Sequence, residues 1–405
     1  MKKRKITAIL LAALTACTIP AAVQANYQQE NKVIAESLSN DSAELVTESL
    51  SNYSLGYMSW GVKHMGLDKL QKKFENSGEK LPEVRVAVMD TGIKKSNRYL
   101  QGRYTDDGYN FVDNNTNVDD DQYHGTEVSG IIADATTSNV KILPIKVMDK
   151  NGDGKMADTA KGIYYALDHG ADVINLSLSG DDKNHTYHSL DDAIAEAISR
   201  NVIVVVAAGN QDTDASLRYP ANKDNVITIT AVNKSNKLGL LANYGSVIDF
   251  ALPGMSILAP HKSIMMLDSG TSMATPHAAA AAALLKTWDK SINQEEVREI
   301  FKEYAIDLGD KGFDDTYGWG MVNLGDFDIN RAPLPRFIRG DANGDGTVNI
   351  ADVTCIQQVL AELDPEQYDE KAADYDGDGV VTIHDATAIQ YMIADMEEQS
   401  VNRFT

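Results

Sequence analysis

Four polar residues of this 405-residue sequence have the types and settings that acyl transfer requires. Ser272 follows a glycine turn at the mouth of a predicted helix, where first-turn N–H groups and the helix dipole favour negative charge. His124 stands in a small-residue turn at the head of another predicted helix, and Asp90 and Asn210 each end an apolar run. A serine, a base, an orienting carboxylate and an amide donor together predict nucleophilic catalysis.

Alternating apolar strands and helices must position these residues. Strands are predicted at 84–89, 140–147, 172–177, 202–206, 225–232 and 247–252, with helices at 124–135, 159–169 and 190–200. Segment 269–285 is predicted to be a tight glycine turn followed by a buried helix that starts at Ser272. Continuous apolar strands separated by helices indicate an α/β fold with a doubly wound parallel sheet covered on both faces. Ligands of such folds lie beyond the carboxyl ends of the strands, so Asp90, Ser177 and Asn210 are expected to converge on one cleft.

The segment around Ser272, SGTSMATPHAAAAAALL, also fits an alanine-rich core helix with an incidental serine at its cap. Pro276 is predicted to lie in the first turn of that helix, where its missing N–H costs nothing. The alanines at 278–283 have no bulk, so the helix is expected to pack closely against the sheet. The remaining motifs decide between the two interpretations.

The order Asp, His, Asn, Ser along the chain excludes two kinds of serine hydrolase. Chymotrypsin-like chains have the order His, Asp, Ser, α/β-hydrolases have Ser, Asp, His, and the G-x-S-x-G elbow is missing here. The sequence resembles the subtilisin-like serine peptidases, or subtilases, over about residues 55–327. The resemblance rests on VAVMDTGI around Asp90, HGTEVSG around His124, VINLSLSG from Val173, AAGN around Asn210, GTSMATPH around Ser272 and YGWGMVN from Tyr317.

The resemblance implies a subtilisin-like fold and a serine endopeptidase acting on proteins and peptides. It implies that Ser272 attacks the peptide carbonyl, that His124 is the general base and then the general acid, and that Asp90 orients His124. The Asn210 side chain and the backbone N–H of Ser272 would form the oxyanion hole. The implied substrate-binding positions are Leu176, Ser177, Leu178, Ser179 and Gly209. A binding subunit with an inactive peptidase domain is the alternative.

Several positions depart from the family pattern or call for comment. Glu127 stands where many relatives have a second histidine, and the triad is expected to remain intact. Segment 94–100, KKSNRYL, lacks the family's usual acidic residue, so no calcium site is implied in this domain. The resemblance makes His277 structural rather than catalytic. Asp212 and Asp214 are expected near the pocket wall, which suggests a preference for basic residues before the cut.

Two acidic loops recur near the C-terminus at a fixed offset of 33 residues. Each has oxygen-bearing side chains at positions 1, 3, 5 and 12 and a glycine at position 6, as calcium coordination requires. The predicted calcium ligands, including a carbonyl at position 7, are Asp341, Asn343, Asp345, Thr347, Asp352, Asp374, Asp376, Asp378, Val380 and Asp385. A similar run from Asp149 has Ala160 at position 12, which predicts a turn between a strand and a helix.

The duplicated loop and helix resemble a dockerin over 338–397. A dockerin implies two bound calcium ions and a cohesin partner on a cellulosome-type scaffold, and so small a core should need metal to fold. The expected recognition pairs, 350–351 and 383–384, differ from the Ser-Thr pair of the best-known dockerins, which leaves the cohesin type open. The alternative is an unattached protease whose small domain only stabilises the large one.

The N-terminus predicts secretion. Four basic residues, an apolar run and a small-residue cleavage site form a signal peptide at 1–25, with a lipoprotein anchor at Cys17 as the minor alternative. Cleavage makes the formal net charge of −22 more negative, and such a surface repels nucleic acid and anionic membranes. Cys355 is then the sole remaining cysteine, so core size and metals must supply stability.

The predicted product is therefore a secreted, scaffold-associated serine endopeptidase. Its predicted organisation is a signal peptide at 1–25, a short pro-segment at 26–54, a subtilisin-like peptidase domain at 55–328, a linker at 329–337 and an all-α calcium-binding dockerin at 338–397. The pro-segment is much shorter than the folding-assistant domain usual in the family.

Overall fold

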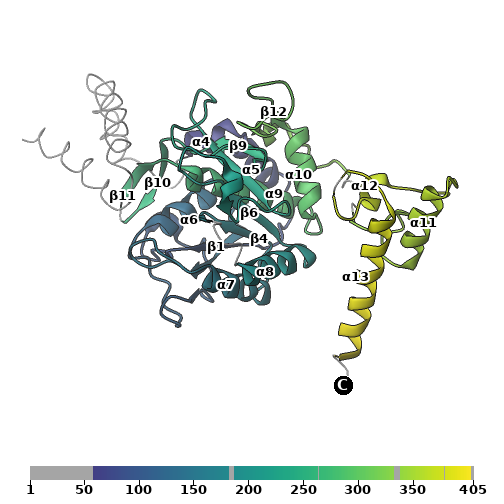
Figure 1. Ribbon diagram of the computed structural model, residues 1–405. Coiled ribbons are helices and arrows are strands. Elements are labelled where there is room, and N and C mark those ends of the chain that lie inside the picture. Colours follow the sequence, from purple (N-terminus) through teal and green to yellow (C-terminus); the bar gives the residue numbers. More distant parts are fainter. Residues whose placement is uncertain (1–57, 182–186, 263, 333–337, 378, 403–405) are drawn as a thin grey trace, which may run out of the picture. The chain divides into compact units, whose positions relative to one another are not determined.

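The computed structural model describes residues 58–181, 187–262, 264–332, 338–377 and 379–402 (Figure 1). The predicted signal peptide, Cys17, the pro-segment, the end of the linker and Asp378 lie outside these residues. The chain divides into two compact units, one running to Lys290 together with Tyr304–Phe327, the other formed by Ser291–Glu303 and Asp328–Thr405. Among the helices in the described ranges, none is long and apolar enough to cross a membrane.

The first unit is built on a seven-stranded sheet in the order β2-β3-β1-β4-β6-β8-β9, with every neighbouring pair parallel. Its strands are β1 (Val84–Asp90), β2 (Tyr109–Asn110), β3 (Val140–Lys146), β4 (Val173–Leu176), β6 (Ile203–Ala207), β8 (Ile227–Val232) and β9 (Phe250–Pro253). The predicted parallel α/β sheet is confirmed. The order reverses between β1 and β4, and in open α/β sheets the ligand crevice lies at such a switch point.

Helices cover both faces of this sheet, because its strands are apolar on both sides (Figure 1). On one face α7 (Met156–Asp168) and α8 (His188–Ser199) pack residues such as Ile163 and Ile194 against Met89 and Ile174. On the other face α6 (His124–Ala135) and α9 (Thr271–Trp288) pack together, and α9 contacts β1, β4, β6, β8 and β9. The alanines at 278–283 are fully buried, as their small size allows.

The prediction for Pro276 was wrong. This residue lies inside α9, beyond its first turn, where a helical residue would normally donate its N–H to the carbonyl four residues earlier. The carbonyl without that donor belongs to Ser272, and the Ser177 hydroxyl donates to it at 3.0 Å. The proline therefore frees a backbone acceptor on Ser272, which ties the candidate nucleophile to the end of β4.

Several elements were not anticipated from the sequence. β10 (Ile257–His261) and β11 (Ile264–Asp268) form an antiparallel hairpin that leads into α9. The other elements of this unit are α4 (Trp60–His64), α5 (Leu67–Asn76), η1 (Arg98–Leu100), β5 (Gly180–Asp181), η2 (Ala215–Leu217), β7 (Arg218–Tyr219), β12 (Ala305–Ile306), β13 (Met321–Val322) and η3 (Leu324–Asp326). The run from Asp149 lies between β3 and α7, and the Asp149 carboxylate accepts from the N–H groups of Asn151 and Asp153.

The second unit contains α10 (Gln294–Glu303), α11 (Ile350–Leu360), α12 (Glu370–Ala373) and α13 (Ile383–Asn402). Its small buried core consists of Ala342, Val353, Cys355, Ile356, Ala373, Ala386 and Ile389.

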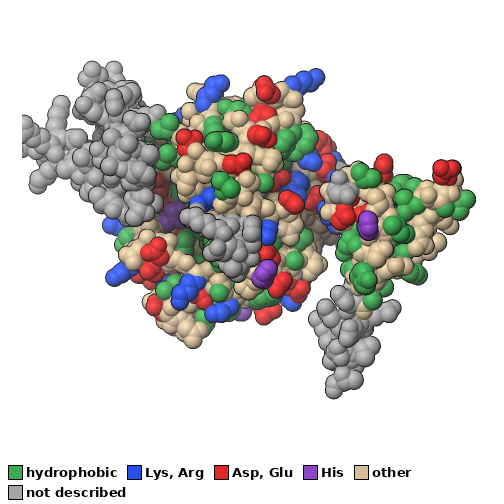
Figure 2. Space-filling model, in the orientation of Figure 1, with side chains coloured by type: hydrophobic (Ala, Val, Ile, Leu, Met, Phe, Trp, Pro, Cys, Tyr) green, Lys and Arg blue, Asp and Glu red, His purple; other side chains and the backbone are tan. Residues whose placement is uncertain are grey.

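Figure 2 shows Lys and Arg side chains scattered among acidic ones over the visible face of the molecule.

Candidate active site and calcium loops

Asp90 and His124 are joined by a short hydrogen bond at the carboxyl edge of the sheet. Asp90 is the last residue of β1 and is fully buried, and its Oδ1 accepts from the N–H of Thr91 at 2.7 Å. His124 is the first residue of α6, and its Nδ1 lies 2.8 Å from Asp90 Oδ1 and 2.9 Å from Oδ2. Since the ionised carboxylate can only accept, Nδ1 carries the proton and Nε2 is left as the base.

The electrostatics of this pair favour a charged imidazole. Burial lowers the pKa of His124, but the charge of Asp90 and its hydrogen bond raise it by more, so the pKa lies above its usual range. Glu127 and Asp268 act in the same direction. Asp90 therefore stabilises the imidazolium that forms when His124 accepts a proton.

The turn before α6 fixes the position of His124. Tyr123 has a φ of 89°, a left-handed conformation that costs energy for a residue other than glycine. The buried carboxylate of Asp120 supports this turn by accepting from the N–H of Tyr123 at 2.6 Å and of Thr126 at 2.9 Å. A carboxylate that accepts from first-turn N–H groups also complements the helix dipole, so α6 begins at the histidine.

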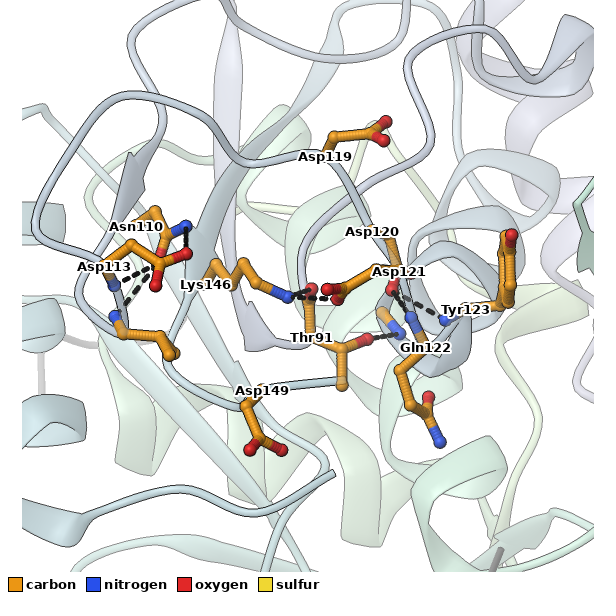
Figure 3. A network of polar contacts seen from close by, with 12 residues as sticks. Thr91, Asn110, Asp113, Asp119, Asp120, Asp121, Gln122, Tyr123, Lys146 and Asp149 are labelled. Carbon is orange, nitrogen blue, oxygen red and sulfur yellow. Dashed lines mark hydrogen bonds and ion pairs between the residues drawn. The ribbon is translucent and has the colours of Figure 1, made fainter. Parts of the chain in front are cut away.

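Lys146 links the loop after Asp90 to the loop before His124 (Figure 3). Its side chain is 4 % exposed, and its ammonium donates to the Thr91 carbonyl and to Asp121 Oδ1, the latter at 2.8 Å. The Thr91 hydroxyl in turn accepts from the N–H of Gly125 at 2.9 Å. Sequence reasoning missed Lys146; its signal is a lysine at the carboxyl end of an otherwise apolar predicted strand.

Replacing Lys146 by methionine should lower kcat about 10-fold or more while changing KM less. The ammonium fixes Thr91, and a small displacement of aligned catalytic groups costs up to about 100-fold in rate. Steady-state kinetics on a peptide substrate measure this effect. Lys141→Met is the matched control, because Lys141 lies on the same strand and its ammonium donates, among the described residues, to the exposed Gly102 carbonyl alone. Equal losses in both variants would contradict the positioning role.

Polar atoms of Ser272 and Asn210 both lie close to the point where a side chain on Gly270 would begin. Asn210 is exposed, and its Oδ1 accepts from the N–H of Thr271 at 2.9 Å. Its Nδ2 group is thereby turned outward and makes no hydrogen bond with the described residues. A Cβ on Gly270, whose φ is 152°, would lie 3.2 Å from Asn210 Nδ2 and 3.4 Å from Ser272 Oγ. The missing side chain therefore keeps the space between the hydroxyl and the amide donor free.

The predicted substrate-binding residues differ in how far their side chains are exposed. Leu176 is fully buried, and Ser177 is 5 % exposed with its hydroxyl bound to Ser272, so these two side chains face inward. Leu178 and Ser179 are partly exposed. The Ser179 hydroxyl would lie 3.3 Å from a Cβ on Gly209, which places these two positions side by side.

The charged residue beside Ser179 was not anticipated from the sequence: the Nη2 of Arg218 lies 3.5 Å from Ser179 Oγ. A positive charge therefore lies beside the predicted substrate segment. Asp212 and Asp214 are exposed, and Asp214 caps η2 by accepting from the N–H of Ser216 at 2.8 Å. That these two aspartates lie near the pocket wall stays a prediction.

His277 is not part of this site. It is fully buried inside α9, its Nδ1 lies 2.9 Å from the Met273 carbonyl oxygen, and a Cβ added at Gly61 would strike its ring. Burial lowers the pKa of His277 to about 4, so the ring is neutral at ordinary pH. Its place in the core agrees with the structural role predicted for it.

The two acidic loops repeat the same hydrogen bonds at corresponding positions. The position-1 carboxylates, Asp341 and Asp374, accept from the N–H of the glycine five residues later. The position-12 carboxylates, Asp352 and Asp385, are fully buried and accept from the N–H three residues earlier, which caps α11 and α13. The repeated bonds agree with the sequence duplication and turn both sets of oxygens inward.

The donor sets fit calcium. Ligand oxygens of Asp374, Asp376 and Asp385 lie within 4.8 Å of one another. In the first loop burial raises the pKa of Asp341, and the neighbouring charges of Asp352 and Asp345 raise it further. Like charges held this close repel unless a cation lies between them, and calcium prefers oxygen ligands. Asn343 and Thr347 complete the first set, and Val380 can supply only its backbone carbonyl to the second.

The chain is similar to known proteins in two separate regions. The profile of the subtilase family matches residues 82–320, and that of the dockerin type I domain matches residues 339–394. The cell wall-associated protease of Bacillus subtilis (strain 168) is 39% identical over 261 residues, 60% of this chain and 28% of that protein. Thermitase of Thermoactinomyces vulgaris is 36% identical over 261 residues, 62% of this chain and 88% of that protein.

A solved structure is also similar. The crystal structure of a cold adapted subtilisin-like serine proteinase is 28% identical, covers 60% of this chain and 89% of its own, and has a TM-score of 0.54. The chain spans 28% of the Bacillus subtilis relative's length and 59% of that of the thermophilic serine proteinase of Bacillus sp. (strain AK1), which is 37% identical. The C-terminal repeat is a dockerin type I domain, and the chain belongs to the subtilase family.

Proposed function

We propose that this protein is a secreted serine endopeptidase that its dockerin attaches, in the presence of calcium, to a cohesin-bearing scaffold of the cellulosome type. The observation that carries the enzymatic part is the 2.8 Å contact between His124 Nδ1 and Asp90 at the carboxyl edge of the sheet. Ser272 is the second residue of α9, a helix that contacts β1 and β4. The dockerin type I domain carries the attachment, since cohesins are the partners of dockerins. The domain limits given above are part of the proposal.

The proposed mechanism uses the chain's own residues. Ser272 Oγ attacks the scissile carbonyl while His124 Nε2 accepts its proton, and Asp90 stabilises the imidazolium that results. The oxyanion then accepts hydrogen bonds from Asn210 Nδ2 and from the backbone N–H of Ser272. His124 next gives its proton to the leaving amine, and water hydrolyses the acyl-enzyme by the reverse sequence.

The substrate would lie along residues 176–179. Because the side chains of Leu176 and Ser177 face inward, this segment would bind substrate through its backbone, as an added strand. Gly209 would border the pocket for the residue before the cut. In the dockerin, bound calcium would hold the two loops in shape, through the ligands named above; Asp378 completes the second set in this proposal.

Two binding assays test the proposal directly. A fluorophosphonate probe should label the protein without residues 1–54, and Ser272→Ala should abolish the label, because the probe reacts only with an activated serine. A panel of immobilised cohesins should capture the protein with calcium and release it with chelator. An unlabelled parent would favour the inactive binding subunit, and no capture by any cohesin would favour the unattached protease.

Replacing Asn210 by leucine should lower kcat by about 10²–10³-fold and leave KM nearly unchanged. The amide donor acts on the oxyanion, which develops in the transition state and the tetrahedral intermediate but not in the bound substrate; the magnitude is the one known for the corresponding residue of subtilisin. Steady-state kinetics give the separate constants. The control is Gln357→Leu, which changes an exposed amide side chain on α11, in the other unit of the chain. A rise in KM alone would contradict the oxyanion role.

A further inference from the structure

A second carboxylate and histidine are paired one helical turn from His124. Glu127 lies three residues after His124 on α6, and its side chain is 6 % exposed. Its Oε1 is 2.6 Å from Nδ1 of His261, the last residue of β10. A buried carboxylate is costly unless it is paired, so the contact holds the hairpin and α6 together. None of the steps proposed above uses these two residues.

His261 contacts residues on both sides of His124. Besides its bond to Glu127, its ring centroid lies 5.0 Å from that of Tyr123, the strained residue immediately before His124. The Lys262 ammonium lies 4.8 Å from the centroid of the Tyr123 ring. The hairpin continues through β11, which ends at Asp268, four residues before Ser272. One hairpin therefore connects the start of α6 with the start of α9.

The charges that face this pair come from four elements. Asp90 on β1 and Asp268 on β11 act on His124, as does Glu127 itself. His261 on β10, Asp268 and His124 act on Glu127. Burial raises the pKa of Glu127 to about 7, although its hydrogen bond with His261 lowers it. The carboxylate therefore gains its charge in the pH range in which a serine peptidase must free its base.

We propose, on the basis of the function proposed above, that Glu127 and His261 are positioning residues for His124, and that the Glu127 charge sets the lower pH limit of the peptidase. A negative charge one turn away stabilises the imidazolium, so His124 becomes a free base only at a higher pH. Removing the charge moves the acidic limb of kcat/KM to lower pH. The bond to His261 and the contact with Tyr123 keep the imidazole aligned.

The test is the pH profile of kcat/KM for Glu127→Gln in the full-length mature chain. Glutamine keeps the size and the acceptor oxygen for His261 but carries no charge. We expect the acidic limb to shift to lower pH by about half a unit or more, with the plateau within about threefold of the parent. An unshifted limb would overturn the proposal.

Asp134→Asn is the matched control. Asp134 is a second carboxylate of α6, two turns beyond Glu127, where burial raises its pKa to about 7 as well; its Oδ2 accepts from the Ser59 N–H. It is remote from His124, so its variant should keep the parental limb. An equal shift in both variants would show a general charge effect of α6 and would also overturn the proposal.

A second variant tests the proposal if Glu127→Gln fails to fold. His261→Gln should lower kcat with little change in KM, because Tyr123 and Glu127 lose their common contact. An unchanged kcat would contradict the positioning role of His261. The pH dependence of fluorophosphonate labelling reports the same limb when turnover is too slow to measure. An unlabelled and inactive parent would refute the proposed function itself, whereas an active parent with an unshifted limb refutes only this inference.

Discussion

Replacing Ser272 by alanine should lower the rate of casein hydrolysis by the mature protein by about 10⁶-fold, the loss known for the nucleophile of subtilisin. Without the hydroxyl no acyl-enzyme can form, and His124 and Asp90 have no proton to move. The small remaining rate would come from substrate binding and the Asn210 donor. The comparison uses unfolded casein and equal amounts of the two proteins.

Two further variants make the result specific. Ser235→Ala changes an exposed serine in the loop after β8 and should cleave at the parental rate. Adding His124→Ala to Ser272→Ala should cost little more, because residues that act as a unit are not additive. A Ser272→Ala protein that retained a tenth of the parental rate would refute the assigned nucleophile.

The sequence allowed the sheet and its edge to be predicted because both depend on local patterns. Runs of β-branched residues such as VIVVV at 202–206 are typical of buried strands, and each candidate residue was expected at the end of a strand or the start of a helix. The structure brings Asp90 and His124 together at 2.8 Å, although they are 34 residues apart in sequence. Topology supplies this contact, since parallel strands end at one edge.

The contacts that support the site could not be predicted in the same way. Glu127 and His261 are separated by 134 residues, and neither belongs to a repeating pattern. The β10–β11 hairpin was missed because its residues do not alternate between apolar and polar. Lys146 was missed because a charge in a buried strand has no meaning until its partners, Thr91 and Asp121, are known.

Pro276 shows a different kind of error. A proline was correctly expected to lack the backbone N–H that a helical residue donates. The position of Pro276 relative to the start of α9 was predicted wrongly. Because α9 begins at Thr271, the proline deprives the Ser272 carbonyl of a helical N–H donor, and the Ser177 hydroxyl donates to this carbonyl instead. A boundary error of a few residues thus concealed a contact between the candidate nucleophile and the predicted substrate segment.

Removing calcium should unfold the dockerin and abolish its capture by a cohesin. The hydrophobic cluster that the described residues form in this module has seven members. In the first loop burial raises the pKa of Asp341 and the charges of Asp352 and Asp345 raise it further, a repulsion that a cation would relieve. At a calcium concentration of about 1,000 times Kd, each ion contributes about 4 kcal/mol of stability that disappears with chelation. Far-UV circular dichroism of the full chain and cohesin capture, each with calcium and with chelator, measure the loss.

A pair of aspartate variants ties this effect to the two loops. Asp385→Asn removes the buried position-12 charge of the second loop, which also caps α13 through the Thr382 N–H, and should weaken capture by about 100-fold or more. Asp153→Asn changes the similar acidic run after β3, which has no closing carboxylate, and should leave capture unchanged. Because both variants remove one negative charge from an acidic glycine-rich run, a difference between them cannot come from net charge alone. Capture that survives both chelation and Asp385→Asn would contradict the predicted dependence of cohesin binding on calcium.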